Sequence, residues 1–204
     1  MKRIVATLAI ALTLAGCASE QQTWKATATT DEFTDKTTMM VTTGDLGTPS
    51  WIVTQPLHFY PVVRKEGSEI YVGIMSGGRF KVPVGTVQLR IDQNDAWTIT
   101  PQETPVSMAP SIPIAPLVTL QGEQAVLVNN AQEQAMKATS QLMSPYTVTG
   151  GDKAKQILKQ MISGHLIKYR TVGINQAAST TGEAVIDTSL ANSLREIGIE
   201  PNSL

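Results

Sequence analysis

Apolar and polar residues alternate over short distances in the first half of the chain. Valine, isoleucine, threonine and aromatic residues gather in runs between residues 24 and 100, and turn-forming residues separate these runs. Such runs are typical of β-strands. The pattern predicts strands over residues 24–29, 37–43, 51–54, 57–64, 69–75, 80–92 and 97–100. Because short turns join antiparallel neighbours, we expect these strands to form antiparallel sheet.

In two of these strands the pattern also predicts burial or a change of direction. Within residues 69–75 apolar side chains fall on both alternating positions, which predicts a strand buried on both faces. Within residues 80–92 the apolar positions change parity at Gly85, which predicts a bulge or bend there.

The second half of the chain turns to helical patterns after a proline-rich segment. Five prolines lie within residues 101–116, and because proline removes a backbone donor, we predict a connector with polyproline character. Residues 124–143 have the alanine and glutamine content of a helix, which Pro145 ends. A second helix is predicted between Asp152 as N-cap and Gly164, with apolar positions at helical spacing: Ala154, Ile157, Leu158, Met161 and Ile162.

A late strand and a short helix close the chain. Residues 166–172 have a strand pattern, and Asp187 or Ser189 is expected to cap a final helix that Gly198 ends. We expect the late strand to pair with, or pack against, strands before residue 100.

These elements together predict the fold class. We expect a protein that is mainly β with helices in its second half, an antiparallel β-sandwich-like single domain over residues 24–204. The proline-rich connector and the first helix form a predicted insertion at about residues 101–150.

The chain begins with the pattern of an export signal. Basic residues at positions 2 and 3 precede an apolar run over residues 4–14. This run is about half as long as the roughly 20 apolar residues that a membrane span needs. We therefore predict a cleavable signal peptide over residues 1–16.

The apolar run leads into Leu14-Ala15-Gly16-Cys17, which resembles the lipobox of bacterial lipoproteins. The resemblance implies cleavage after Gly16, a diacylglyceryl group on the thiol of Cys17 and an acyl chain on its new amino group. Several acyl chains make a stable anchor, because each buried CH₂ contributes about 0.8 kcal/mol. Residues 17–23 are then the lipidated cysteine and a polar tether.

The residues after Cys17 indicate in which membrane the protein is anchored. Ala18 and Ser19 follow the cysteine, whereas an aspartate in the first of these positions favours retention at the inner membrane. By resemblance to that sorting rule we expect the outer membrane, with the domain lipid-anchored on its periplasmic face.

Charge and cysteine content narrow the function classes. The chain has 16 basic and 17 acidic side chains, and loss of the signal removes Lys2 and Arg3. The weakly acidic balance that remains lacks the clustered positive charge of nucleic-acid binding proteins, so we expect no nucleic acid partner. Cys17 is the only cysteine, so we expect no disulfides, zinc fingers or thiol catalysis in the exported domain.

Candidate catalytic and metal sites are each better explained by local structure. His58 and His165 have no second ligand or base beside them in the sequence. Residues 149–155 open a helix after glycines but lack the spacing of a phosphate loop, and residues 92–95 lack the glycine and distal glutamate of a calcium loop. We therefore expect a non-enzymatic protein with no metal and no cofactor other than the lipid on Cys17.

Short motifs in separated parts of the chain follow one arrangement, at residues 31–36, 87–92, 166–171 and 187–190. This arrangement resembles the TagO or VasI family of periplasmic accessory proteins of type VI secretion. The resemblance implies a β-sandwich with an accessory role, although the cysteines typical of that family are missing here. Its matched positions are Arg90 and Arg170, which are candidate binding residues or simply surface charges on strands.

Three functions remain open at this point. The first hypothesis is an outer-membrane lipoprotein whose periplasmic domain is a binding or accessory module for another envelope protein of unknown identity. The second is an envelope enzyme that acts on the cell wall, and the third is a phage- or plasmid-encoded lipoprotein that blocks a receptor. We also expect residues 101–144 either to carry partner contacts or to lie over one sheet edge.

Overall fold

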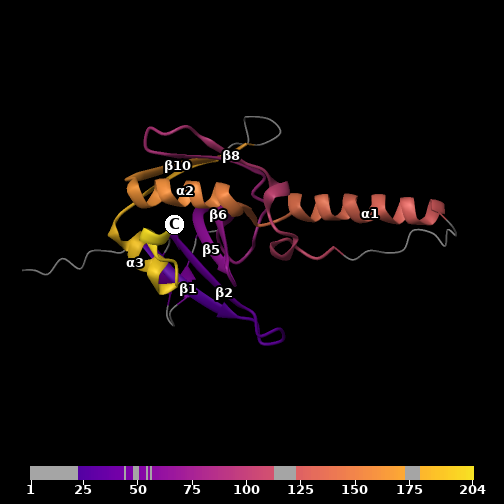
Figure 1. Cartoon of the computed structure of the whole chain (residues 1–204), viewed down its shortest axis with the longest axis horizontal. Helices are drawn as coiled ribbons and strands as arrows, with labels where there is room; N and C mark the ends of the chain where they lie inside the picture. Colours follow the sequence, from indigo (N-terminus) through magenta and orange to yellow (C-terminus); the bar gives the residue numbers. More distant parts are fainter. Residues whose placement is uncertain are drawn as a thin grey trace, which may run out of the picture.

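The computed structural model describes residues 23–43, 45–47, 51–53, 55, 57–112, 123–172 and 180–204. The predicted signal peptide over residues 1–16 and the lipidation site at Cys17 lie outside the described residues. Within the described ranges the chain forms two antiparallel sheets, one two-stranded hairpin and three α-helices (Figure 1). The predicted fold class, mainly β and β-sandwich-like with helices in the second half, is confirmed.

The larger sheet has five strands in the order β1-β2-β5-β6-β9. Its strands are β1 (Trp24–Thr30), β2 (Thr37–Thr43), β5 (Phe59–Glu66), β6 (Glu69–Ser76) and β9 (Tyr146–Thr149). A separate hairpin of β3 (Asp45–Gly47) and β4 (Trp51–Val53) lies between β2 and β5 in the sequence. Burial on both faces of β6 is confirmed from Val72 to Ser76, since all five residues are buried.

The smaller sheet has four strands in the order β11-β10-β7-β8. Its strands are β7 (Thr86–Ile91), β8 (Trp97–Ile99), β10 (Leu166–Val172) and β11 (Thr181–Val185). Strand β10 pairs with β7, and Ile167 stands opposite Ile91. The expectation that the late strand joins strands before residue 100 is therefore confirmed.

The helices differ in how they meet the sheets. Helix α2 (Gly151–Ser163) runs between the two sheets in Figure 1. The Gln160 side chain on this helix accepts a hydrogen bond of 2.9 Å from the indole N–H of Trp97. Helix α3 (Thr188–Glu196) packs on β1 and β2. Both helices contribute to one apolar core with the inner faces of both sheets. Helix α1 (Glu123–Leu142) instead extends away from this body.

The prediction of one strand over residues 80–92, with a bulge or bend at Gly85, is wrong for residues 80–85. Strand β7 begins only at Thr86, and Gly85 before it has φ of +74°. The amide of Val82 donates to Ser76 Oγ at 3.0 Å, and the amide of Val84 donates to the Ser144 carbonyl at 3.2 Å. Because Pro83 has no amide to donate, the segment between these two residues makes loop contacts in place of a strand ladder.

The proline-rich connector is also more structured than predicted. Its first part forms two short 3₁₀ turns, η1 (Pro101–Glu103) and η2 (Val106–Met108), in which Pro101 and Met108 are buried. Thr104 lies between them, and its Oγ accepts a hydrogen bond of 3.1 Å from the amide of Val148 at the outer edge of β9. Pro113 and Pro116 lie outside the described residues.

Helix caps agree with the sequence in one case and differ in another. Asp187 caps α3, because the Ser189 amide donates to its carboxylate at 2.9 Å. Gly150, and not Asp152, is the N-cap of α2, and Asp152 lies in the first turn, where its negative charge suits the helix dipole. Strands β9 and β11 are not in the sequence prediction, and β9 falls inside the range predicted as an insertion.

Candidate binding face of the four-stranded sheet

The outer face of the four-stranded sheet carries a group of charged side chains. In β7 the residues Val87, Leu89 and Ile91 are buried, while Gln88 and Arg90 alternate with them and point outward. Strand β10 follows the same rule. Because side chains on a strand alternate between faces, its polar residues Lys168 and Arg170 share the outer face with those of β7.

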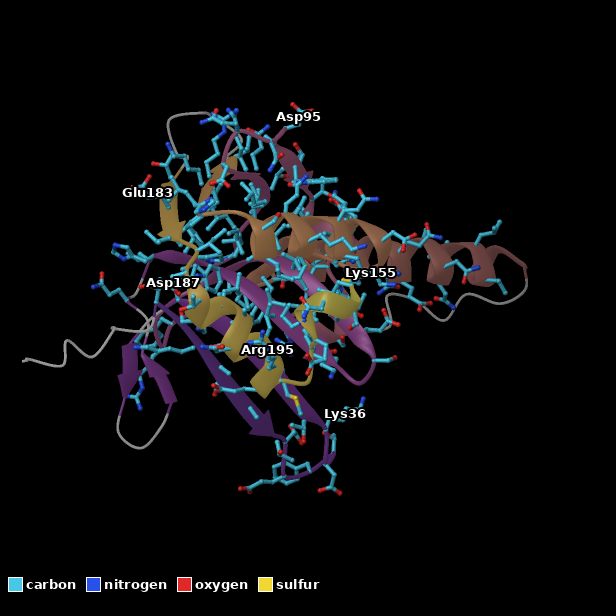
Figure 2. All side chains as sticks on the ribbon, turned by 60° about the vertical axis from the view of Figure 1, so that its left-hand side comes forward. Lys36, Asp95, Lys155, Glu183, Asp187 and Arg195 are labelled. Carbon is cyan, nitrogen blue, oxygen red and sulfur yellow. The ribbon has the colours of Figure 1, made fainter. Side chains whose placement is uncertain are left out.

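Strand register brings these outer residues into rows. Lys168 stands opposite Arg90 on one side and Glu183 on the other, and Arg170 stands opposite Gln88. Directly opposed residues have their Cβ atoms about 5 Å apart. The two arginines that the sequence suggested as candidates are thus neighbours on one face, with a third cation and one carboxylate beside them. Figure 2 shows Glu183 on β11, at the edge of this sheet.

A shallow hollow of about 520 Å³ lies on this face. It is lined from three strands and from the turn before β8, by residues that include Gln88, Arg90, Ala96, Lys168, Arg170 and Glu183. A hollow lined by three cations and one carboxylate favours an anionic group over a neutral one.

Hydrogen bonds hold the two guanidinium groups on the face. Arg170 Nε donates to Gln88 Oε1 at 2.7 Å, across the β7–β10 pair. Arg90 Nη2 donates to the Gln93 carbonyl at 3.3 Å in the turn after β7. An arginine fixed through one nitrogen keeps further N–H groups that can form paired hydrogen bonds with a carboxylate or phosphate.

Tyr169 supports the face from its inner side. Its ring lies against Gly182 on β11, where an added Cβ would come within 2.4 Å of the ring. Its hydroxyl donates to the Phe59 carbonyl of the larger sheet at 2.6 Å. Burial raises the pKa of Tyr169 to about 12, so the hydroxyl stays neutral and serves as a fixed link between the two sheets.

Asp92, in the turn after β7, has a structural role. Asp92 accepts hydrogen bonds from the amides of Leu166 and His165, and these outweigh its partial desolvation and hold the pKa of its carboxyl below the ordinary value. The imidazole of His165 is 3.7 Å from that carboxylate and is exposed. The turn over residues 92–95 therefore connects β7 to β8, and its Asp92 carboxylate holds the start of β10 beside it.

Among the described residues we find no group of three His, Cys, Asp or Glu side chains placed to hold a metal ion. No α-helix in the described ranges is long and apolar enough to cross a membrane.

Sequence reasoning missed Lys168 and Glu183 as members of this face. Lys168 could have been predicted from the sequence, because it lies two residues from Arg170 in a predicted strand, and side chains two residues apart lie on the same face. Glu183 was not, because β11 was not predicted. We find no matching family model, curated protein or solved structure for this chain, so the resemblance to the TagO or VasI family stays a prediction.

Proposed function

We propose that this chain is a lipid-anchored, non-enzymatic binding protein of the bacterial envelope. In this proposal Cys17 carries the lipid at the outer membrane, and the outer face of the four-stranded sheet contacts an acidic group on another envelope protein. The observation that carries the binding part is the set of three cations, Arg90, Lys168 and Arg170, around one exposed hollow. The export pattern at residues 1–17 supports the anchor.

The chemistry of the face supports recognition of a carboxylate. Arginine presents a planar fork of donors that matches the two oxygens of a carboxylate, and charge-assisted bonds of this kind are the stronger ones. The side chains stand on paired strands, which fix their spacing before a partner arrives. Preorganisation of this kind reduces the entropy that binding costs.

The anchor is tested by replacement of the cysteine. Cys17→Ser should abolish labelling of the protein by a fatty-acid analogue in growing cells and leave the precursor uncleaved by the lipoprotein signal peptidase. Labelling that persists in the variant would refute the lipid anchor.

The binding face is tested by site-specific crosslinking in intact cells. A photoreactive amino acid at Thr181, which is exposed beside Arg170 on this face, should give an adduct of defined mass. The adduct should disappear when Arg90 and Arg170 are both changed to alanine, and it should remain in Lys155→Ala, a matched exposed cation on α2. An adduct that survives the double substitution would show that the arginines do not recognise the partner.

A further inference from the structure

The five-stranded sheet has two ends that differ in character. At one end β1 begins, β2 ends, β5 begins and β6 ends, because Trp24 stands opposite Thr43 and Phe59 stands opposite Ser76. We call this the proximal end, since it is where the chain enters from Cys17. The distal end holds the two hairpin turns, over residues 31–36 and 66–69.

Two large apolar side chains project from the loops of the proximal end. Leu57, just before β5, is 69% exposed, and Phe80, shortly after β6, is 85% exposed. The backbone of Leu57 has φ of +62°, a region that residues with a side chain rarely adopt. Backbone strain of this kind is found most often where a loop has a function.

One hydrogen bond joins these two loops, and two others tie each loop to the strand beside it. The Gly77 amide donates to the His58 carbonyl at 2.8 Å, and the Gln55 amide donates to the hydroxyl of Tyr60 at 2.9 Å. Lys81 Nζ donates to the Ser76 carbonyl at 2.9 Å. The apolar side chains are therefore presented by loops tied to the sheet.

The two ends of the sheet also differ in charge. Residues 57–58 and 77–85 contain the cations Arg79 and Lys81 and no carboxylate, and the β3–β4 hairpin, which connects β2 to β5 at this end, adds the single carboxylate Asp45. The distal turns contain five carboxylates and one lysine: Asp31, Glu32, Asp35, Glu66 and Glu69, with Lys36. Figure 2 shows Lys36 at the distal turn, away from Asp187. Asp187 lies near the proximal end, but it is engaged in capping α3.

The length of the tether limits where the proximal end can lie. Cys17 precedes Trp24 by seven residues, which span at most about 25 Å when fully extended. Neighbouring strands lie about 5 Å apart, so the loops beside β5 and β6 are only about 10 to 15 Å across the sheet from β1. A lipid on Cys17 would thus keep the membrane surface within reach of Leu57 and Phe80.

We propose that the proximal end docks on the lipid surface. Leu57 and Phe80 enter the boundary between headgroups and acyl chains, and Arg79 and Lys81 meet anionic headgroups. Apolar side chains combined with basic ones are what binds a surface of this kind, and the acidic distal end is repelled by it. This inference rests on the proposed lipid anchor at Cys17, and it adds a fixed orientation of the domain on the membrane.

The test uses the lipidated full-length mature protein in vesicles of phosphatidylethanolamine and phosphatidylglycerol. In Phe80→Cys the introduced thiol is the one available for labelling, because the lipid occupies the thiol of Cys17. An environment-sensitive fluorophore on it should shift to the blue and be quenched by lipids that carry nitroxides on their acyl chains. Phe33→Cys is the matched control, because Phe33 is 97% exposed at the distal end.

The expected result is quenching several-fold stronger at position 80 than at position 33. Equal quenching at both positions, or a blue shift at position 80 without quenching, would overturn the docking. Flotation of the vesicles measures the anchor separately: protein that does not float refutes the anchor and the docking together, whereas protein that floats without quenching refutes only the docking. Leu57→Cys repeats the measurement if Phe80→Cys does not fold.

Discussion

Helices α1 and α2 were both predictable from the sequence, yet only one of them belongs to the core. Helix α2 buries one face along its length, with Ala154, Ile157, Leu158 and Met161 all inaccessible to solvent. Helix α1 is longer, but within residues 126–142 only Ser140 and Gln141 are buried. A regular helical pattern thus predicts that a helix forms, whereas the width of the apolar face predicts whether the helix packs in the core.

Helix α1 is held by polar groups at its C-terminal end. Gln141 Nε2 donates to the carbonyls of Gln102 at 3.0 Å and of Thr104 at 2.7 Å. Ser140 Oγ donates to the Pro110 carbonyl at 2.6 Å. Val126, Leu127 and Val128 near the other end remain exposed. Of the two alternatives for residues 101–144, a position over a sheet edge applies to Thr104 beside β9 but not to α1, which extends away from the sheets. A role of α1 in partner binding stays a prediction.

The largest expected effect comes from loss of everything after β9. A chain that ends at Gly150 lacks α2, β10, β11 and α3, and 11 of the 21 buried residues of the main apolar core lie beyond that point. Because each Å² of lost apolar burial costs about 25 cal/mol, we expect no cooperative thermal unfolding. A cooperative transition, seen by circular dichroism, would show that the first half is an independent domain.

A single substitution in the apolar face of α2 should come next. Leu158→Ala should lower the free energy of unfolding by about 2–5 kcal/mol, because it opens a cavity in a packed core. Leu127→Ala on α1, where the side chain is 70% exposed, should change it by less than about 0.5 kcal/mol. Urea titrations of the two variants measure the contrast, and equal effects would contradict it.

The polar attachment of α1 should contribute less than the apolar face of α2. Gln141→Ala leaves the carbonyls of Gln102 and Thr104 without their donor, which should cost about 1–3 kcal/mol. Hydrogen exchange should also quicken at the last turn of α1 before it quickens in α2. Unchanged exchange there would show that other contacts hold the helix.

A pH effect should be smaller still, because the ion pair between Glu103 and Lys153 is partly solvated. Desolvation raises the pKa of Glu103, but Lys153 at 2.8 Å and the Thr100 amide outweigh it and hold the pKa below its ordinary value. The stabilisation is therefore present above the ordinary pKa of a glutamate and is lost as pH falls through the folded value. Glu103→Gln should remove at most about 1 kcal/mol of this acid-dependent stability, measured by urea unfolding as a function of pH.

The smallest expected effect comes from removal of the exposed part of α1. Residues 110 and 140 are in hydrogen-bond contact, so a short flexible loop can replace residues 113–138 without strain. The free energy of unfolding should stay within about 1 kcal/mol of that of the parent, since loop closure depends only weakly on length. Crosslinking in cells then shows whether α1 contacts a partner: adducts lost from a folded protein assign them to α1.

The sequence predicted the individual helices and strands better than it predicted which strands pair with one another. Helix α2 was found because its apolar residues follow the helical period, whereas β5 and β6 were found as apolar runs bounded by turn residues. Strand β9 was missed because its four residues lie between two helices, and its pairing partner β6 is seventy residues earlier in the chain. Such pairing leaves no local signal.

The candidate face was predictable only in part for the same reason. Arg90 and Arg170 were named from short motifs, but their proximity follows from the β7–β10 register, which joins residues eighty positions apart. The exposure of Phe80 was not predicted, because the apolar residues that follow it suggested a strand. Pro83 was the signal against that strand, because it lacks the amide that a ladder needs.

The Thr104 hydroxyl has a consequence for how the protein behaves among its own copies. Strand β9 is the last strand of its sheet, and an open edge can recruit a strand from another chain. Thr104 fills one of the positions that such a strand would occupy, because it accepts the outward amide of Val148. Under the proposed lipid anchor, copies of the protein would lie close together on a membrane, and an edge closed at this point would oppose strand pairing between them.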